Sequence, residues 1–221
     1  MTAVLKPISY LLSLIGHPLF MLMYLLMLYL KVNPYLFPYN SEKDMTMITL
    51  VILFTSVIIP IISILLMLGV GFIDSIQMHK KTERVGPLMV TGIFYIWLYL
   101  NIRTHSAVPI PYATFLLGTL FSMAMAFFIN NFSKISLHAV GLGGLLIGVL
   151  YLLIYYGETY LIFVIGSTAY SIHYLILMLV LLVLMGMVLS ARLYLGAHIN
   201  KDIYGGFVVG VLGQFLAYGL F

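Results

Sequence analysis

The sequence predicts an all-α protein: a polytopic bundle of about seven transmembrane helices, with six as the alternative count. Two observations support this prediction. Of the 221 residues, 63% are hydrophobic and only 7% are charged, whereas soluble domains carry about a quarter charged residues. Long apolar stretches also recur between short polar segments, and a helix of about 20 apolar residues crosses the hydrocarbon core. We therefore expect an integral membrane protein that forms a single domain over residues 1–221.

Seven stretches are long and apolar enough, or nearly so, to cross a bilayer. They cover residues 8–31, 45–70, 87–102, 110–131, 137–156, 168–190 and 202–220. The first is too long for the apolar core of a signal peptide, and no small-residue cleavage pattern follows it. We expect it to remain as the first span. The third stretch is short, and for that reason six spans is the alternative.

Glycines in the fifth and seventh stretches have a spacing typical of helix packing. Gly144 and Gly148 lie four residues apart, as do Gly206 and Gly210, and small residues at this spacing let helices approach closely in lipid. We expect them to serve packing rather than phosphate binding. Such contacts fit one chain or two copies of it, so a homo-oligomer stays open.

The composition argues against several other classes of protein. The formal net charge is +4, but no basic run accompanies it, so nucleic acid is not an expected partner. The chain contains no cysteine, which excludes disulfides and thiolate metal sites and leaves the compartment open.

Counting crossings places three polar segments, 74–87, 131–138 and 190–202, on one face of the membrane. Ionisable groups beside lipid are costly, so a function is their default explanation. The other face receives charged residues without comparable neighbours, and we expect ordinary interfacial loops there. These are Lys31, Lys43, Arg103 and Glu158.

The third polar segment has the pattern of a nucleophile or base. His198 and Asp202 would stand one turn apart on a helix, where the carboxylate can accept a hydrogen bond from the imidazole and fix its tautomer. Arg192 precedes a short loop containing Gly196, so its guanidinium could fold back and hold a tetrahedral oxyanion with paired donors. A phosphate suits this arrangement.

The other two segments add polar groups to the same face. Ser136 and His138 lie at the start of the fifth stretch, where the serine could cap the helix and donate to a phosphate oxygen. Lys81 and Arg84 lie just ahead of Pro87, an early residue of the third stretch. We read the remaining histidines as ordinary interfacial or hydrogen-bonded residues: His17, His79, His105 and His173.

A metal site is a weaker interpretation of the same residues. His138, His198 and Asp202 would supply three ligands, but dense ligand spacing is absent and Arg192 would repel a cation. We expect no metal and no other cofactor.

The order of these motifs resembles the type 2 phosphatidic acid phosphatase superfamily, whose third signature is Ser-Arg, five residues, His, three residues, Asp. Here Ala191 separates Ser190 from Arg192, so the match covers Arg192, His198 and Asp202. The chain looks most like a small bacterial membrane branch of that superfamily, and the resemblance covers roughly residues 74–220.

The two other signatures are kept less closely. Ser136-Leu137-His138 resembles the second signature, Pro-Ser-Gly-His, with Ile135 and Leu137 in place of the proline and glycine. The first signature is a lysine followed six residues later by Arg-Pro. Arg84 is two residues short of a direct Arg-Pro, and Lys80 or Lys81 is nearer than the pattern requires.

The resemblance implies a metal-independent phosphatase with a phosphohistidine intermediate. His198 would attack phosphorus, Asp202 would orient it, and His138 would protonate the leaving group and then activate water. Arg192, Arg84, Lys81 and Ser136 would hold the phosphate oxygens. The substrate would be a lipid phosphate or diphosphate, of the phosphatidic acid, phosphatidylglycerophosphate or polyprenyl diphosphate type, in the inner (plasma) membrane of a bacterium.

A second class stays open from the residues alone. A non-catalytic protein could use the same cationic pocket to bind a phospholipid headgroup, or to transport an anion or a lipid. Simple anion binding does not need Asp202, and we detect none of the internal repeats typical of transporters. Positive charges do not decide which side of the membrane the pocket faces, because several belong to the pocket itself.

Overall fold

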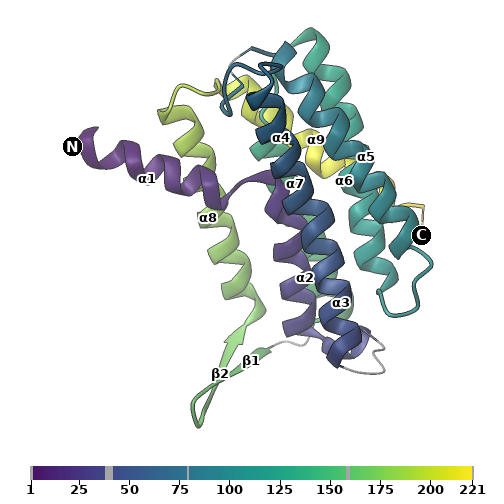
Figure 1. Cartoon of the computed structure of the whole chain (residues 1–221). Helices are drawn as coiled ribbons and strands as arrows, with labels where there is room; N and C mark the ends of the chain where they lie inside the picture. Colours follow the sequence, from purple (N-terminus) through teal and green to yellow (C-terminus); the bar gives the residue numbers. More distant parts are fainter. Residues whose placement is uncertain (1, 38–41, 79, 158–159, 221) are drawn as a thin grey trace.

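The chain forms a bundle of transmembrane helices, as predicted. The computed structural model describes residues 2–37, 42–78, 80–157 and 160–220 and contains one small β-hairpin besides its helices (Figure 1). Six helical segments are long and apolar enough to cross a membrane: Leu5–Val32, Lys43–Gly69, Thr82–Ile102, Ile110–Phe132, Leu137–Tyr156 and Tyr174–Tyr194.

The first apolar stretch is not one straight helix. It consists of α1 (Thr2–Ile15), a 3-10 turn η1 (Pro18–Phe20) and α2 (Met21–Val32). Figure 1 shows α1 projecting sideways from the bundle, whereas α2 runs along it. Pro18 has no backbone N–H to continue α1, so the straight span expected over 8–31 is corrected to two helices that meet at a break.

The second crossing contains an irregular turn. It runs through α3 (Glu42–Leu53), a π-helical turn η3 (Phe54–Ile58) and α4 (Ile59–Gly69). Pro60 cannot donate to the carbonyl of Ser56 four residues earlier. The Tyr95 hydroxyl donates to that carbonyl instead, at 3.3 Å, and so ties the turn to the next helix.

The third, fourth and fifth crossings follow the prediction closely. They are η4 (Thr82–Arg84) continuing into α5 (Val85–Ile102), α6 (Ile110–Phe132), and α7 (Leu137–Tyr156). The third crossing begins at Thr82, ahead of the predicted start at residue 87. Its first turn buries Glu83 and Arg84. That addition makes the segment long enough to span.

The sixth crossing starts later than predicted. Strands β1 (Tyr160–Ile165) and β2 (Thr168–His173) form an antiparallel hairpin, and α8 (Tyr174–Tyr194) follows. The first six residues of the expected span 168–190 are therefore strand. Gly166 takes a φ of 63° at the turn, and His173 accepts a hydrogen bond from the N–H of Leu175, which fixes the start of the helix.

The last helix, α9 (Asn200–Tyr218), packs between α6 and α7. It is 19 residues long but more polar than the six segments above, because it contains residues such as Asp202 and the fully buried Gln214. A side chain at Gly206 would collide with the Ser136 carbonyl, and one at Gly210 with the Val140 carbonyl. The close packing predicted for these glycines is confirmed.

The three polar segments expected on one face lie at the same end of the bundle, around the loop before η4, the α6–α7 turn and the α8–α9 turn (Figure 1). The hairpin and the loop between α5 and α6 lie at the opposite end. The apolar core, with Leu25, Tyr29, Tyr112 and Phe115 among its fully buried residues, lies between these two ends.

Candidate active site

His198 and Asp202 form the pair that the sequence predicts. Their Nδ1 and Oδ2 atoms are 3.2 Å apart, and the His198 side chain is almost completely buried. The same carboxylate oxygen accepts from the backbone N–H of Ile199 at 3.3 Å, as an acidic residue in the first turn of a helix commonly does. Because Nδ1 donates to a carboxylate, the hydrogen-bond network assigns an unprotonated Nε2 to His198.

Hydrogen bonds to backbone carbonyls hold the three polar segments together. The N–H of Ser136 donates to the carbonyl of Asp202 at 3.1 Å, and Lys134 Nζ donates to the carbonyl of Ala197 at 2.8 Å. Arg84 Nη1 donates to the carbonyl of Ile135 at 2.8 Å. Since each contact joins residues far apart in sequence, the site exists only when the bundle is assembled.

Arg192 carries an unsatisfied donor into this site. Its Nε is buried and has no hydrogen-bond partner among the described residues, yet the residue lines a cavity. The turn after α8 returns the chain toward the site through Gly196, whose φ is 63°, and the N–H of Ala197 donates to the Arg192 carbonyl. A buried guanidinium with a free N–H is suited to bind an anion.

His138 is oriented by the first helix. Its Nε2 lies 3.0 Å from the carbonyl oxygen of Ser13. That carbonyl would normally accept from His17 four residues on, but the N–H of His17 bonds to Leu14 instead, because α1 ends there. Since a carbonyl only accepts, His138 donates through Nε2, and its Nδ1 is left as an acceptor when the ring is neutral.

Two of the predicted phosphate ligands lie outside the cavity. Ser136 is fully buried and caps α7, accepting from the N–H of Ala139 at 3.4 Å. Lys81 is exposed and donates from Nζ to the carbonyl of Asn131 at 2.8 Å. The structure thus gives Ser136 a capping contact and Lys81 a contact between two loops, and neither lines the cavity.

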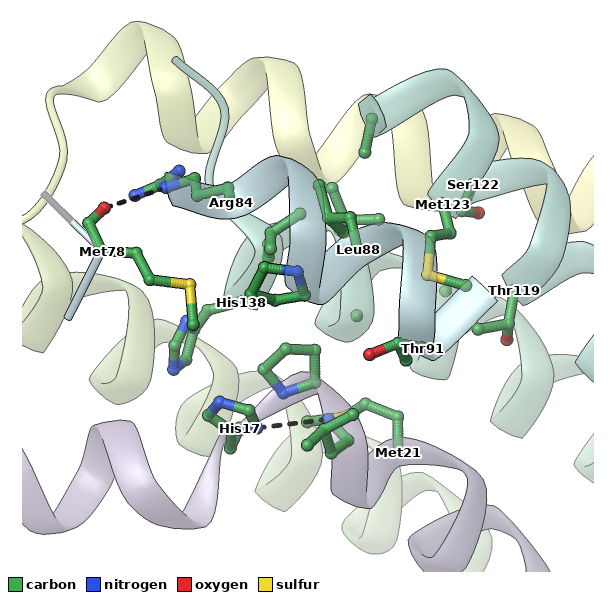
Figure 2. Close-up of a pocket in the computed structure, with 18 of the residues that line it drawn as sticks. His17, Met21, Met78, Arg84, Leu88, Thr91, Thr119, Ser122, Met123 and His138 are labelled. Atoms are coloured by element: carbon green, nitrogen blue, oxygen red, sulfur yellow. Dashed lines mark hydrogen bonds between the residues drawn. The ribbon is translucent and has the colours of Figure 1, made fainter. Parts of the chain in front are cut away.

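A cavity of about 410 Å³ joins the remaining polar groups to the apolar interior. Figure 2 shows Arg84 and Met78 at one end of it, His17 and His138 in the middle, and side chains of α5 and α6 at the other end. Much of the remaining lining is apolar, with a few hydroxyls: Met21, Leu88, Thr91, Tyr95, Phe115, Thr119, Ser122, Met123 and Ala126. A single molecule with a charged head and an apolar tail would match both ends.

Burial and the surrounding charges keep His198 neutral. Burial is the largest cause, and the nearby guanidinium of Arg84 is the next, in lowering the pKa of His198 to about 4, against a partial opposing effect of Asp202. Burial also lowers the pKa of the Lys134 ammonium. An unprotonated imidazole in a cationic cavity is the form that a nucleophile needs.

His17 is the site residue that sequence reasoning missed. We expected an ordinary interfacial histidine, but His17 lines the cavity and its ring lies 5.4 Å from that of His138, edge to face. The signal was the Gly16-His17-Pro18 run inside an apolar stretch, which marks a helix break. His105 and His173 do not line the cavity, and His79 lies outside the described residues.

Within the described parts of the chain, no three histidine or acidic side chains gather as metal ligands. In comparisons with protein families, with curated proteins and with solved structures, nothing matches this chain.

Proposed function

We propose that this integral membrane protein is a lipid phosphatase that hydrolyses a lipid phosphate or diphosphate through a phosphohistidine intermediate. The observation that carries the proposal is the cavity itself, in which a neutral His198 held by Asp202, a guanidinium with a free donor and a second oriented histidine adjoin an apolar interior. The resemblance of the motifs to the type 2 phosphatidic acid phosphatase superfamily supports the same reading and suggests the inner (plasma) membrane of a bacterium.

In the first step, Nε2 of His198 attacks phosphorus, and the bond from phosphorus to the lipid oxygen breaks. Protonated His138 gives its Nδ1 proton to the leaving oxygen, so the lipid alcohol or lipid phosphate departs neutralised by one proton. The phosphorylated imidazole is positively charged, and the Asp202 carboxylate at its Nδ1–H stabilises it.

In the second step, water attacks phosphorus and His198 leaves as a neutral imidazole. His138, now neutral, accepts the proton of the water through Nδ1 while its Nε2–H stays on the Ser13 carbonyl. Inorganic phosphate is released, and both histidines return to their starting protonation states. The carbonyl of Ser13 therefore orients His138 in both steps.

Two arginines supply the electrostatic stabilisation on which phosphoryl transfer depends. Arg192 offers the free Nε–H. Arg84 uses Nε on the Met78 carbonyl and Nη1 on the Ile135 carbonyl, which fixes its guanidinium at the cavity. We leave Ser136 and Lys81 out of the phosphate-binding set, because neither lines the cavity.

The test is phosphate release by the detergent-purified protein from a panel of lipid phosphates and diphosphates, with a chelator present. We expect the parent protein to release phosphate and His198→Asn to release none. The asparagine amide can still donate to Asp202, so the variant keeps the local contact and loses only the nucleophile. The matched control is His173→Asn at the opposite end of the bundle, which should act like the parent.

Binding of lipid phosphate without release by the parent would contradict this proposal. It would favour the alternative of a headgroup-binding or transport protein that uses the same cavity. Asp202 argues for catalysis, because a carboxylate beside a plain anion site weakens binding unless it serves His198.

A further inference from the structure

The break between α1 and η1 brings a fourth segment of the chain to the cavity. Gly16 and Gly141 make this possible by leaving space for close contacts. A side chain at Gly16 would collide with Val188, one turn before Arg192 on α8, and one at Gly141 would press on Pro18 at 3.1 Å. Because Gly141 follows His138 by one turn on α7, the break is held between the two helices that carry Arg192 and His138.

The local structure fixes the tautomer of His17. Its Nδ1 accepts from the backbone N–H of Leu19 at 3.4 Å (Figure 2) and so caps η1. A neutral imidazole whose Nδ1 is an acceptor carries its proton on Nε2. His17 therefore brings an N–H donor to the cavity, next to His138.

Ser13 gives a second, independent sign that this segment meets a ligand. The residue is 7% exposed, it lines the cavity, and its Oγ is buried without a hydrogen-bond partner among the described residues. Buried hydroxyls are normally satisfied, so an unpaired one at a cavity indicates a missing partner. Its backbone carbonyl is already occupied by His138.

We propose that His17 Nε2–H and Ser13 Oγ–H donate hydrogen bonds to the phosphate group of the bound lipid, beside the leaving oxygen that His138 protonates. This inference rests on the proposed phosphatase function. It makes the end of α1 part of the substrate-binding site, where the sequence predicted only part of a first span, with His17 as an ordinary interfacial or hydrogen-bonded histidine.

Two substitutions separate the two nitrogens of His17. His17→Asn places an oxygen near the Nδ1 position, where it can still accept from Leu19 as asparagine does in turns, but it removes the distant donor. His17→Gln places an amide N–H near the Nε2 position and gives up the cap. If His17 binds phosphate, His17→Asn should lower kcat/KM at least tenfold and His17→Gln should retain most of it. A purely structural cap predicts the reverse order.

Matched controls come from the same chain. His173 makes the same cap, with Nδ1 accepting from the N–H of Leu175, at the far end of α8 (Figure 1). His173→Asn and His173→Gln should leave kcat/KM unchanged. Ser13→Ala should raise KM several-fold, and Ser9→Ala, one turn earlier on α1 and equally buried, should not.

The outcomes distinguish the two proposals. If the parent protein releases no phosphate, the proposed function fails. If the parent is active and both His17→Asn and Ser13→Ala equal it, the function stands and the inference about this segment is overturned. Thermal melting in detergent identifies a misfolded variant. Should His17→Asn misfold, a folded Ser13→Ala with parental KM, or a folded His17→Gln without activity, overturns the inference.

Discussion

At the scale of single residues, the site depends on which nitrogen of each histidine holds a proton. One ring nitrogen of each histidine has a fixed partner: His198 bonds to Asp202, and His138 to the Ser13 carbonyl. His17 accepts from the N–H of Leu19. When all three rings are neutral, they present an acceptor, an acceptor and a donor toward the cavity. The nucleophile, the base of the second step and a phosphate ligand need those three forms.

Burial, and after it the charge of Arg84, sets the pH range in which the nucleophile works. The pKa of His198 is lowered to about 4, so the ring is neutral at pH 7 and becomes protonated only as the pH falls through that range. Arg84 is the strongest charge that lowers it. We predict that Arg84→Gln moves the acid limb of kcat/KM to higher pH and reduces its plateau. The test is the pH dependence of kcat/KM for both proteins with the same substrate. Ionisation of the substrate affects both profiles equally, so it cancels when they are compared.

The result that would contradict this prediction is an acid limb that stays in place, or moves to lower pH, in Arg84→Gln. His105→Asn serves as the control, because His105 lies outside the cavity and should leave the profile of the parent unchanged.

At the scale of the elements, the packing of α9 against α7 places Asp202 beside the start of α7. At Gly210, a Cβ would meet the backbone of Val140 and Gly144, whereas Gly205 on the same helix has no neighbour within 4 Å. We predict that Gly210→Ala separates the helices and lowers the melting temperature in detergent by several degrees. Gly205→Ala should leave it unchanged or raise it, since alanine favours a helix by up to about 1 kcal/mol.

The same pair of variants links packing to activity. Gly210→Ala should also reduce phosphate release, because a displaced α9 moves Asp202 out of position. The displacement also disturbs the hydrogen bond that the N–H of Ser136 donates to the carbonyl of Asp202. Equal melting temperatures for the two variants would show that α9 and α7 do not pack as closely as the structure has them.

At the scale of the whole molecule, the three polar segments lie at one end of the bundle and the hairpin at the other (Figure 1). The chain has no cysteine, so single cysteines report their own side of the membrane. We predict that Ser133→Cys reacts with an impermeant maleimide from one side of sealed vesicles. Ser106→Cys and Ser167→Cys, both exposed, should react only from the other side. Labelling of all three from one side would contradict this arrangement.

The sequence alone determined the class of the protein, most of the crossings and the pairing of His198 with Asp202. Apolar length, helical spacing and glycine spacing are local properties, so each can be read from a short run of residues. The same locality explains the errors. The hairpin 160–173 is apolar like a span, so part of it was included in the predicted sixth span. The prediction of a straight first span did not allow for the helix break at Gly16 and Pro18.

Only the tertiary structure decided which polar groups reach the cavity. Ser136 and Lys81 have the residue types of phosphate ligands, but their side chains make structural hydrogen bonds instead. Ser136 accepts from the N–H of Ala139, and Lys81 donates to the carbonyl of Asn131. The neighbours of His17 in sequence, Gly16 and Pro18, indicate a helix break, but only their contacts with α8 and α7 bring His17 to His138. Such positions depend on side-chain packing between distant segments, which no local pattern contains.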